Sequence, residues 1–172
     1  MIPLSSVLTG EPEVIGYKVL TATAASVRFD FQPMYRMVQV DGFILRDANA
    51  NTTQLRINND SGANYAYQYI NADDITVASA RASGQTLISL DAVDTVDASS
   101  YHHISAIISK PSASSGGVVV STGGYDPAAS IKLNLDGAVW SDTTNLMTRI
   151  DLISSANNFA AGSSFTVFGW RK

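Results

Sequence analysis

The amino-acid sequence predicts an all-β protein, and two observations carry this prediction. Apolar residues recur at every second position in several short runs, as in strands that place one face against a core. No window keeps apolar residues at positions i, i+3, i+4 and i+7 over three turns, so no long amphipathic helix is expected. About ten short strands without intervening helices indicate an antiparallel β-sandwich or barrel.

The alternation is clearest over 26–31, where Val27, Phe29 and Phe31 fall on one face and polar residues on the other. The alternation over 131–136 predicts in the same way that Ile131, Leu133 and Leu135 face the core. The full set of expected strands, in chain order, is Tyr17–Thr21, Ser26–Phe31, Tyr35–Leu45, Tyr65–Ile70, Thr86–Leu90, Tyr101–Ser109, Val118–Ser121, Ile131–Asp136, Arg149–Leu152 and Ser164–Val167.

Glycine-containing pairs are expected to supply the turns between these strands, because glycine adopts the backbone angles that tight turns require. One short helical turn is expected near Asn71–Ala78. The turn signals are Asp41-Gly42, Ser61-Gly62, Ser83-Gly84, Ser115-Gly116-Gly117, Gly123-Gly124 and Asp136-Gly137.

Composition restricts the classes of function. The 172 residues suit one domain with a full core. Eleven basic and fifteen acidic residues give a net charge of −4, which argues against broad binding to nucleic acid or to an anionic membrane. The absence of cysteine excludes disulfide scaffolds and thiolate chemistry. The start of the chain lacks the basic flank of a signal peptide, and no apolar run reaches the length of a membrane span.

The first 13 residues are expected to form an extended N-terminal arm, and residues 14–172 the sandwich domain. The arm contains Pro3, Gly10 and Pro12 and shows no strand alternation. Two interpretations stay open: the arm folds back on its own domain, or it grips a neighbouring subunit. Its candidate partner-interface residues are Ile2, Leu4, Val7 and Leu8.

The two histidines are not expected to be catalytic. His102 and His103 are adjacent on an expected strand, so their side chains point to opposite faces and cannot easily converge on one metal or substrate. No Gly-x-Ser-x-Gly nucleophile motif accompanies them. One imidazole is expected to face the core or a neighbour, and the other to face solvent.

Three further clusters have only weak chemical signals. Asp91, Asp94 and Asp97 recur in a loop-like stretch, where solvated acids are the preferred interpretation over a hydrolytic pair. Residues 47–51 resemble the first half of a calcium loop but lack its glycine and its final glutamate. A row of tyrosines on one strand face favours the wet side of a core or a subunit interface over a sugar-stacking surface. The row comprises Tyr65, Tyr67 and Tyr69. No catalytic, metal-binding or cofactor-binding residue is therefore assigned, and no cofactor is expected.

Three blocks of sequence bring a family into view. They are Phe31–Arg36, in which a proline turn follows a strand; Leu55–Ala66, in which a polar turn leads to an aromatic strand; and the C-terminal part with Trp140, Thr148–Leu152 and Asn157–Gly169. Over residues 14–172 the chain resembles the jelly-roll-like structural proteins of tailed bacteriophage particles, which include head decorations, head fibres and tail-fibre tips.

The resemblance implies a jelly-roll-like sandwich in the virion that binds other virion proteins, such as the major capsid protein or tail components, and carries no shared catalytic residues. A capsid decoration, cement or head-fibre role is preferred, because a compact body with a short arm suits it. A tail-fibre or receptor-binding protein that contacts host glycans is the alternative, and a glycan-cleaving enzyme is not expected. The slightly positive mean hydropathy of +0.08 favours buried intersubunit surface, hence a homo-oligomer, with a trimer preferred.

Overall fold

All of the regular structure is β-strand. The structure, a computed structural model, describes residues 10–48, 52–73, 75–90, 101–125 and 132–171. Within these ranges the chain forms twelve strands and no helix, and every strand pairing is antiparallel. The all-β prediction is therefore confirmed. No helix in the described part of the chain is long and apolar enough to cross a membrane.

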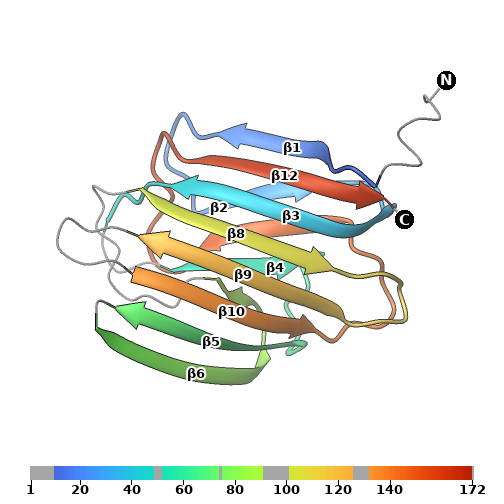
Figure 1. Cartoon of the computed structure of the whole chain (residues 1–172). Coiled ribbons are helices and arrows are strands. Elements are labelled where there is room, and N and C mark those ends of the chain that lie inside the picture. The colour runs from blue at the N-terminus through green and yellow to red at the C-terminus, as the bar shows by residue number, and fades with distance from the viewer. Residues whose placement is uncertain (1–9, 49–51, 74, 91–100, 126–131, 172) are drawn as a thin grey trace.

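The strands are arranged in two sheets of unequal size (Figure 1). The large sheet contains, in spatial order, β1 (Glu13–Val19), β12 (Ser164–Arg171), β3 (Tyr35–Ile44), β8 (His102–Ser109), β9 (Gly117–Tyr125), β10 (Lys132–Trp140), β5 (Tyr65–Asp73) and β6 (Thr76–Gln85). The small sheet contains β2 (Ser26–Asp30), β11 (Arg149–Ser154), β4 (Thr53–Ile57) and β7 (Ile88–Ser89).

Eight of these strands follow the path of a jelly roll. β1, β12, β3 and β8 are neighbours in the large sheet, and β2, β11, β4 and β7 make up the small one. Along the chain, the strands of this set alternate between the two sheets at every step except from β4 to β7. Two antiparallel four-stranded sheets connected in this way form a double-sheet jelly roll, so the predicted jelly-roll-like sandwich is confirmed.

The other four strands are two hairpins inserted into the jelly roll. β5 and β6 come between β4 and β7 in the chain, and β9 and β10 come between β8 and β11. The hairpins lie side by side and extend the large sheet from β8 in the order β9-β10-β5-β6 (Figure 1). The small sheet has no matching strands, so the far end of the extension, β6, has side chains that are mostly exposed on both faces.

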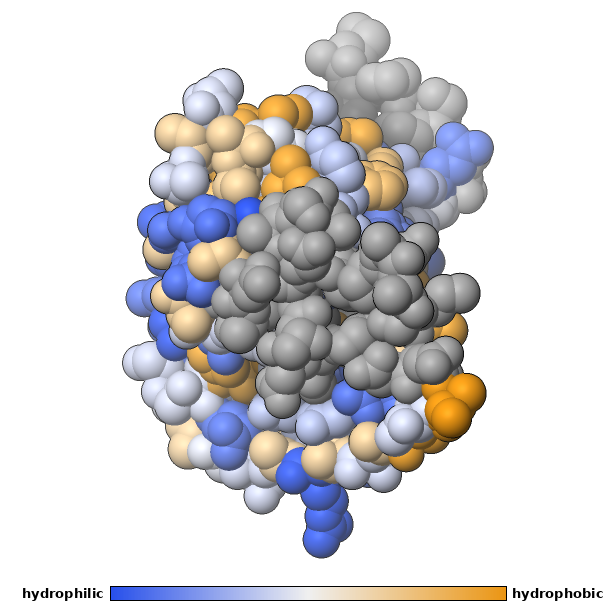
Figure 2. Space-filling view, turned by 90° about the vertical axis from the view of Figure 1, so that its left-hand side faces the viewer, coloured by the Kyte–Doolittle hydropathy of each residue, from blue (hydrophilic) through white to orange (hydrophobic). Residues whose placement is uncertain are grey.

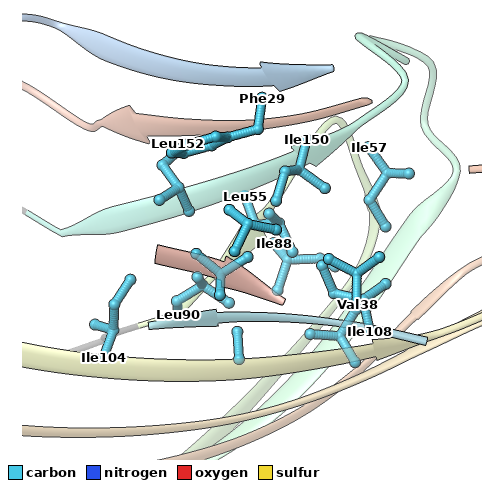
Figure 3. Close-up of a cluster of buried hydrophobic side chains, with 14 of the residues drawn as sticks. Phe29, Val38, Leu55, Ile57, Ile88, Leu90, Ile104, Ile108, Ile150 and Leu152 are labelled. Carbon is cyan, nitrogen blue, oxygen red and sulfur yellow. The ribbon is translucent and has the colours of Figure 1, made fainter. Parts of the chain in front are cut away.

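The core lies between the two sheets. Figure 3 shows side chains from both sheets converging, among them Phe29, Leu55, Ile150, Val38 and Ile108. On β2, Val27 and Phe29 are buried while the three polar residues between and beside them are exposed, as the alternation predicted. The strand β1 approaches Phe29 so closely that a Cβ atom on Gly16 would lie 2.5 Å from the Phe29 ring.

Two expectations about the chain path are wrong. The described residues among 71–78 contain no helical turn and belong to the β5–β6 hairpin. Pairing with β10 and within the hairpin satisfies the backbone groups that a helix would otherwise satisfy internally. The glycine pairs at 41–42, 83–84, 123–124 and 136–137 lie inside strands, not in turns. A strand interior tolerates glycine where neighbouring side chains approach closely, as Gly42 illustrates with Ile104 and Phe165 nearby.

The expected faces of β10 are inverted. Leu133 and Leu135 are 58% and 51% exposed, whereas Asn134 and Asp136, expected to face solvent, are buried. The physical reason is Trp140, which is fully buried and has the same strand parity as Asn134 and Asp136. Burial of the indole therefore turns both leucines outward. Ile131 lies outside the described residues.

Candidate functional site

The predicted partner-interface residues are not covered by the structure. Ile2, Leu4, Val7 and Leu8 lie outside the described residues. The strand β1 begins at Glu13, the last residue of the expected arm. The Glu13 carboxylate accepts hydrogen bonds of 2.6 and 2.9 Å from the Arg171 guanidinium at the end of β12.

His102 and His103 point to opposite faces of β8, as predicted. His102 is 2% exposed, and burial, together with the nearby Arg46 and His103, lowers its pKa to about 4. His103 is exposed on the outer face of the large sheet, where its ring lies 4.9 Å from that of Phe43. The two imidazoles therefore do not form one site.

The weak calcium signal at residues 47–51 is only partly covered by the structure, because residues 49–51 lie outside the described ranges. The Asp47 carboxylate accepts hydrogen bonds from the backbone and side chain of Asn158, at 2.8 and 2.7 Å. The Asp47 carboxylate thereby connects the loop after β3 with the loop between β11 and β12. Asp91, Asp94 and Asp97 also lie outside the described residues. Among the residues that are described, no three histidine or acidic side chains gather as metal ligands would.

A polar pocket of about 610 Å³ opens at one end of the sandwich, between the β4–β5 and β10–β11 connections. All of its lining residues are amides, alcohols or carboxylic acids. They are Asn58, Asp60, Asn64, Ser141, Asp142, Thr143, Thr144, Asn145 and Thr148. We call this feature the polar pocket.

The two carboxylates of the polar pocket are held by neighbouring donors. Asp60 accepts hydrogen bonds from the indole of Trp140 at 2.8 Å, from Asn64 at 2.9 Å and from a backbone amide. Asp142 accepts bonds from the backbone and side chains of Thr144 and Asn145. Burial would raise the pKa of both groups, but these donors outweigh it. The pKa of Asp60 is lowered, and that of Asp142 falls to about 2.

The polar pocket offers hydrogen-bonding groups around two carboxylates whose pKa values are lowered. Carboxylates that stay ionised and fully engaged with donors are poor proton shuttles at neutral pH. Beneath them, the Lys110 ammonium is buried, lies 4.6 Å from the Trp140 ring and donates to the carbonyls of Ser115 and Asp142. This rigid support presents hydroxyl and amide groups that suit a polyhydroxylated ligand such as a glycan.

The tyrosine row of β5 lies on the inner face of the sheet. Tyr65 is buried, and its hydroxyl donates to the Ile57 carbonyl and accepts from the Ile57 amide, both at 3.1 Å. Tyr67 is half-buried and packs against the core, and Tyr69 is half-buried. The row lines the inner side of the sheet and is not an open sugar-stacking surface.

A second candidate surface lies on the outer face of the inserted hairpins. We define the outer apolar patch as the exposed large apolar side chains of β5, β6 and β10. Strand register places them on the same face of adjacent strands: Leu135 opposite Ile70, and Leu133 opposite Ala72, which itself pairs with Val77. The members are Ile70, Val77, Leu133, Leu135 and Val139, which are between 45% and 71% exposed.

The outer apolar patch surrounds a depression in the sheet surface. Two adjoining hollows of about 490 and 400 Å³ share Gln68 and Gly137 in their walls. A Cβ atom on Gly137 would meet nothing within 4 Å. The missing side chain therefore leaves space between Leu135 and Val139, and Arg81 lines the hollow on the side of β6. Figure 2 shows the end of the molecule at which the β5–β6 hairpin turns, with a hydrophobic area at the lower right.

The sequence reasoning missed both surfaces. The signal for the outer apolar patch was present, because Trp140 and the two leucines of β10 occupy opposite parities and cannot all be buried under one sheet. The polar pocket combines the loops around Asp60 and Asp142, which are distant in the chain, and no local pattern indicates that they meet.

Comparison with known proteins adds no family assignment. No protein-family model matches the chain, and no curated protein matches it either.

Proposed function

We propose that the chain is a structural protein of a bacteriophage particle, a capsid decoration, cement or head-fibre protein that acts by binding and not by catalysis. The sequence resemblance to virion proteins supports the assignment of the protein to a phage particle, and the outer apolar patch supports a role in binding. Soluble monomers rarely leave apolar patches of more than a few hundred Å² uncovered unless a partner binds there. The partners proposed are other virion proteins and further copies of this chain.

The observation that carries the proposal is the position of the patch on the inserted hairpins. The four added strands bury side chains in the core, among them Trp140. They also place Leu133, Leu135 and Ile70 on the outer face. The extension thus contributes surface in addition to core. A surface of this kind is expected in a protein whose task is to join a larger assembly.

The proposal is tested by locating the protein on intact particles of a phage that encodes it. Gold-labelled antibody against the chain, viewed by electron microscopy, should label the head over its whole surface. Label confined to the tail would replace the decoration role with an adhesion role. Particles without any label would contradict the virion assignment.

The polar pocket favours one alternative, a tail-fibre or receptor-binding protein that contacts host glycans. Its walls offer amide and hydroxyl groups around two ionised carboxylates. Thr143 is exposed in this pocket, so Thr143→Arg should block it without disturbing the support beneath. If this alternative holds, the substitution abolishes binding to a glycan array, whereas Ser26→Arg, exposed on β2 in the small sheet, leaves binding unchanged. An array without any bound glycan would remove the alternative.

A further inference from the structure

We propose that the outer apolar patch is the contact through which this chain binds a second copy of itself. This inference rests on the proposed function, which treats the patch as an assembly surface, and names the partner. Four properties of the described residues support a second copy: complementary relief, area, charge and the form of the sheet.

The relief of the patch fits another patch of the same kind. Leu133, Leu135 and Ile70 project from the sheet, and Leu135 and Ile70 line the hollow over Gly137. Residues 135 and 137 point to the same side of β10, one strand repeat apart. The projecting leucine of one copy can therefore occupy the hollow of the next copy. A ridge and a hollow on one surface complement each other between identical chains.

The area agrees with a stable contact. The exposed parts of the five patch side chains amount to on the order of 500 Å² of apolar surface. A standard-size interface takes about 800 Å² from each partner, of which about 56–58% is apolar. The outer apolar patch thus supplies the apolar share of such an interface, and its polar neighbours Gln68 and Arg81 supply part of a rim.

The charge distribution allows two copies to meet at this face. All five patch members are uncharged, and the cation at its margin is Arg81, which is exposed. The whole chain has a net charge of −4, so copies repel one another at long range. A contact that contains no carboxylate and places an arginine at its rim reduces this repulsion, because the arginine faces a copy with surplus acid.

The form of the surface also suits sheet-on-sheet packing. The patch is the outer face of adjacent, regularly paired strands, with no register shift between β10 and β5. Two such faces pack about 10 Å apart with their side chains interdigitated, as the two sheets of a sandwich do. Contact with a second copy would therefore give the extension an opposing layer.

The test measures the mass of the full-length protein by sedimentation over about 1–100 µM. The wild type is expected to form a dimer, because a contact between the same patch on two copies closes at two chains. Leu135→Asp places a carboxylate in the contact and should weaken association at least about 100-fold. Gly137→Val fills the hollow, where a side chain meets nothing in the isolated chain, and should weaken association while the thermal unfolding of the monomer is retained.

Val19→Asp is the matched control. Val19 is 49% exposed on β1, at the opposite edge of the same sheet, so this substitution should leave association unchanged. A wild type that stays monomeric to 100 µM would overturn the inference. The same holds if Val19→Asp dissociates the oligomer while Leu135→Asp and Gly137→Val do not. If the antibody labels phage heads but the protein is monomeric, the proposed function stands and this inference is overturned. If the protein is oligomeric but no particle is labelled, the proposed function is contradicted and the self-association stands.

Discussion

His102 and His103 show how strand position alone separates two identical side chains. The strand β8 directs His102 into the sandwich and His103 onto the outer face. Burial, the largest effect, and the positive charge of Arg46 disfavour the imidazolium form of His102, and they lower its pKa from 6.5 to about 4. This difference between folded and unfolded protein makes stability depend on pH.

We predict that His102 reduces stability as the pH falls from 7 to 5. In this range the unfolded chain binds a proton at His102 and the folded chain does not, so lower pH favours unfolding. The free energy of unfolding should fall by about 2 kcal/mol from this group. Urea titrations at several pH values should show that the free energy of unfolding depends less steeply on pH in His102→Gln than in the wild type. His103→Gln, the exposed neighbour, should follow the wild type; an equal slope in all three proteins would contradict the prediction.

A second prediction at this scale concerns Phe29, which is 5% exposed and lies beneath the Lys18 ammonium, 5.3 Å from its ring centre. Phe29→Ala removes a large buried ring, and Gly16 has no side chain that could fill the space. We expect the free energy of unfolding, measured by urea denaturation, to fall by about 3–5 kcal/mol. Phe43→Ala is the control, because Phe43 is 54% exposed and should cost less than about 1 kcal/mol. Similar costs for the two substitutions would contradict the assignment of Phe29 to the core.

At the scale of elements, the connection from β4 to β5 is held by the Asn58 side chain and by the Tyr65 hydroxyl group. Asn58 and Asn59 adopt positive φ angles of 53° and 56°, which asparagine tolerates better than most residues. The Asn58 side chain bonds to the backbone of Leu146, Thr148 and Arg149 and thereby joins this turn to the start of β11. The Tyr65 hydroxyl closes the turn through the backbone of Ile57.

Tyr65→Phe should destabilise this connection. The substitution leaves the Ile57 amide without its acceptor in a buried site, whereas the Ile57 carbonyl keeps the Asp60 amide as a donor. The cost should be about 1–3 kcal/mol. Tyr69→Phe is the matched control, because Tyr69 lies on the same face of the same strand and is half-buried. Thermal unfolding should show a lower midpoint for Tyr65→Phe and little change for Tyr69→Phe. An equal effect on both would mean that the hydroxyl of Tyr65 does not hold the turn.

At the scale of the whole molecule, the jelly roll starts at Glu13, where β1 begins. From Glu13 onward, β1 pairs along its length with β12, and the core is formed by described residues from position 27 on. Deleting residues 1–10 should therefore leave a folded domain with an unchanged circular dichroism spectrum. If the arm docks on a partner, the truncated protein no longer joins the particle in a capsid-binding assay. An unfolded product would instead show that the arm belongs to the core.

Much of the fold could be predicted because its signals are local. Alternation on β2 and β12 predicted both the strands and their buried faces, since the core accepts side chains of one parity. The strand β6 was missed, because its alanines, serines and glycine give no apolar alternation. The outer apolar patch and the polar pocket were also not predicted from the sequence. Nothing local shows that β10 lies in an added hairpin, where the more apolar face can point outward.

The sequence by itself determined the class of fold, the position of most strands and the single domain, because the period of two and the turn residues act over a few neighbours. Only the tertiary structure decided which face of β10 is inside and which loops meet at the polar pocket. An alternating strand specifies that its two faces differ, but not which layer covers each of them. That choice depends on competition among distant residues, and here the burial of Trp140 turns Leu133 and Leu135 towards the surface.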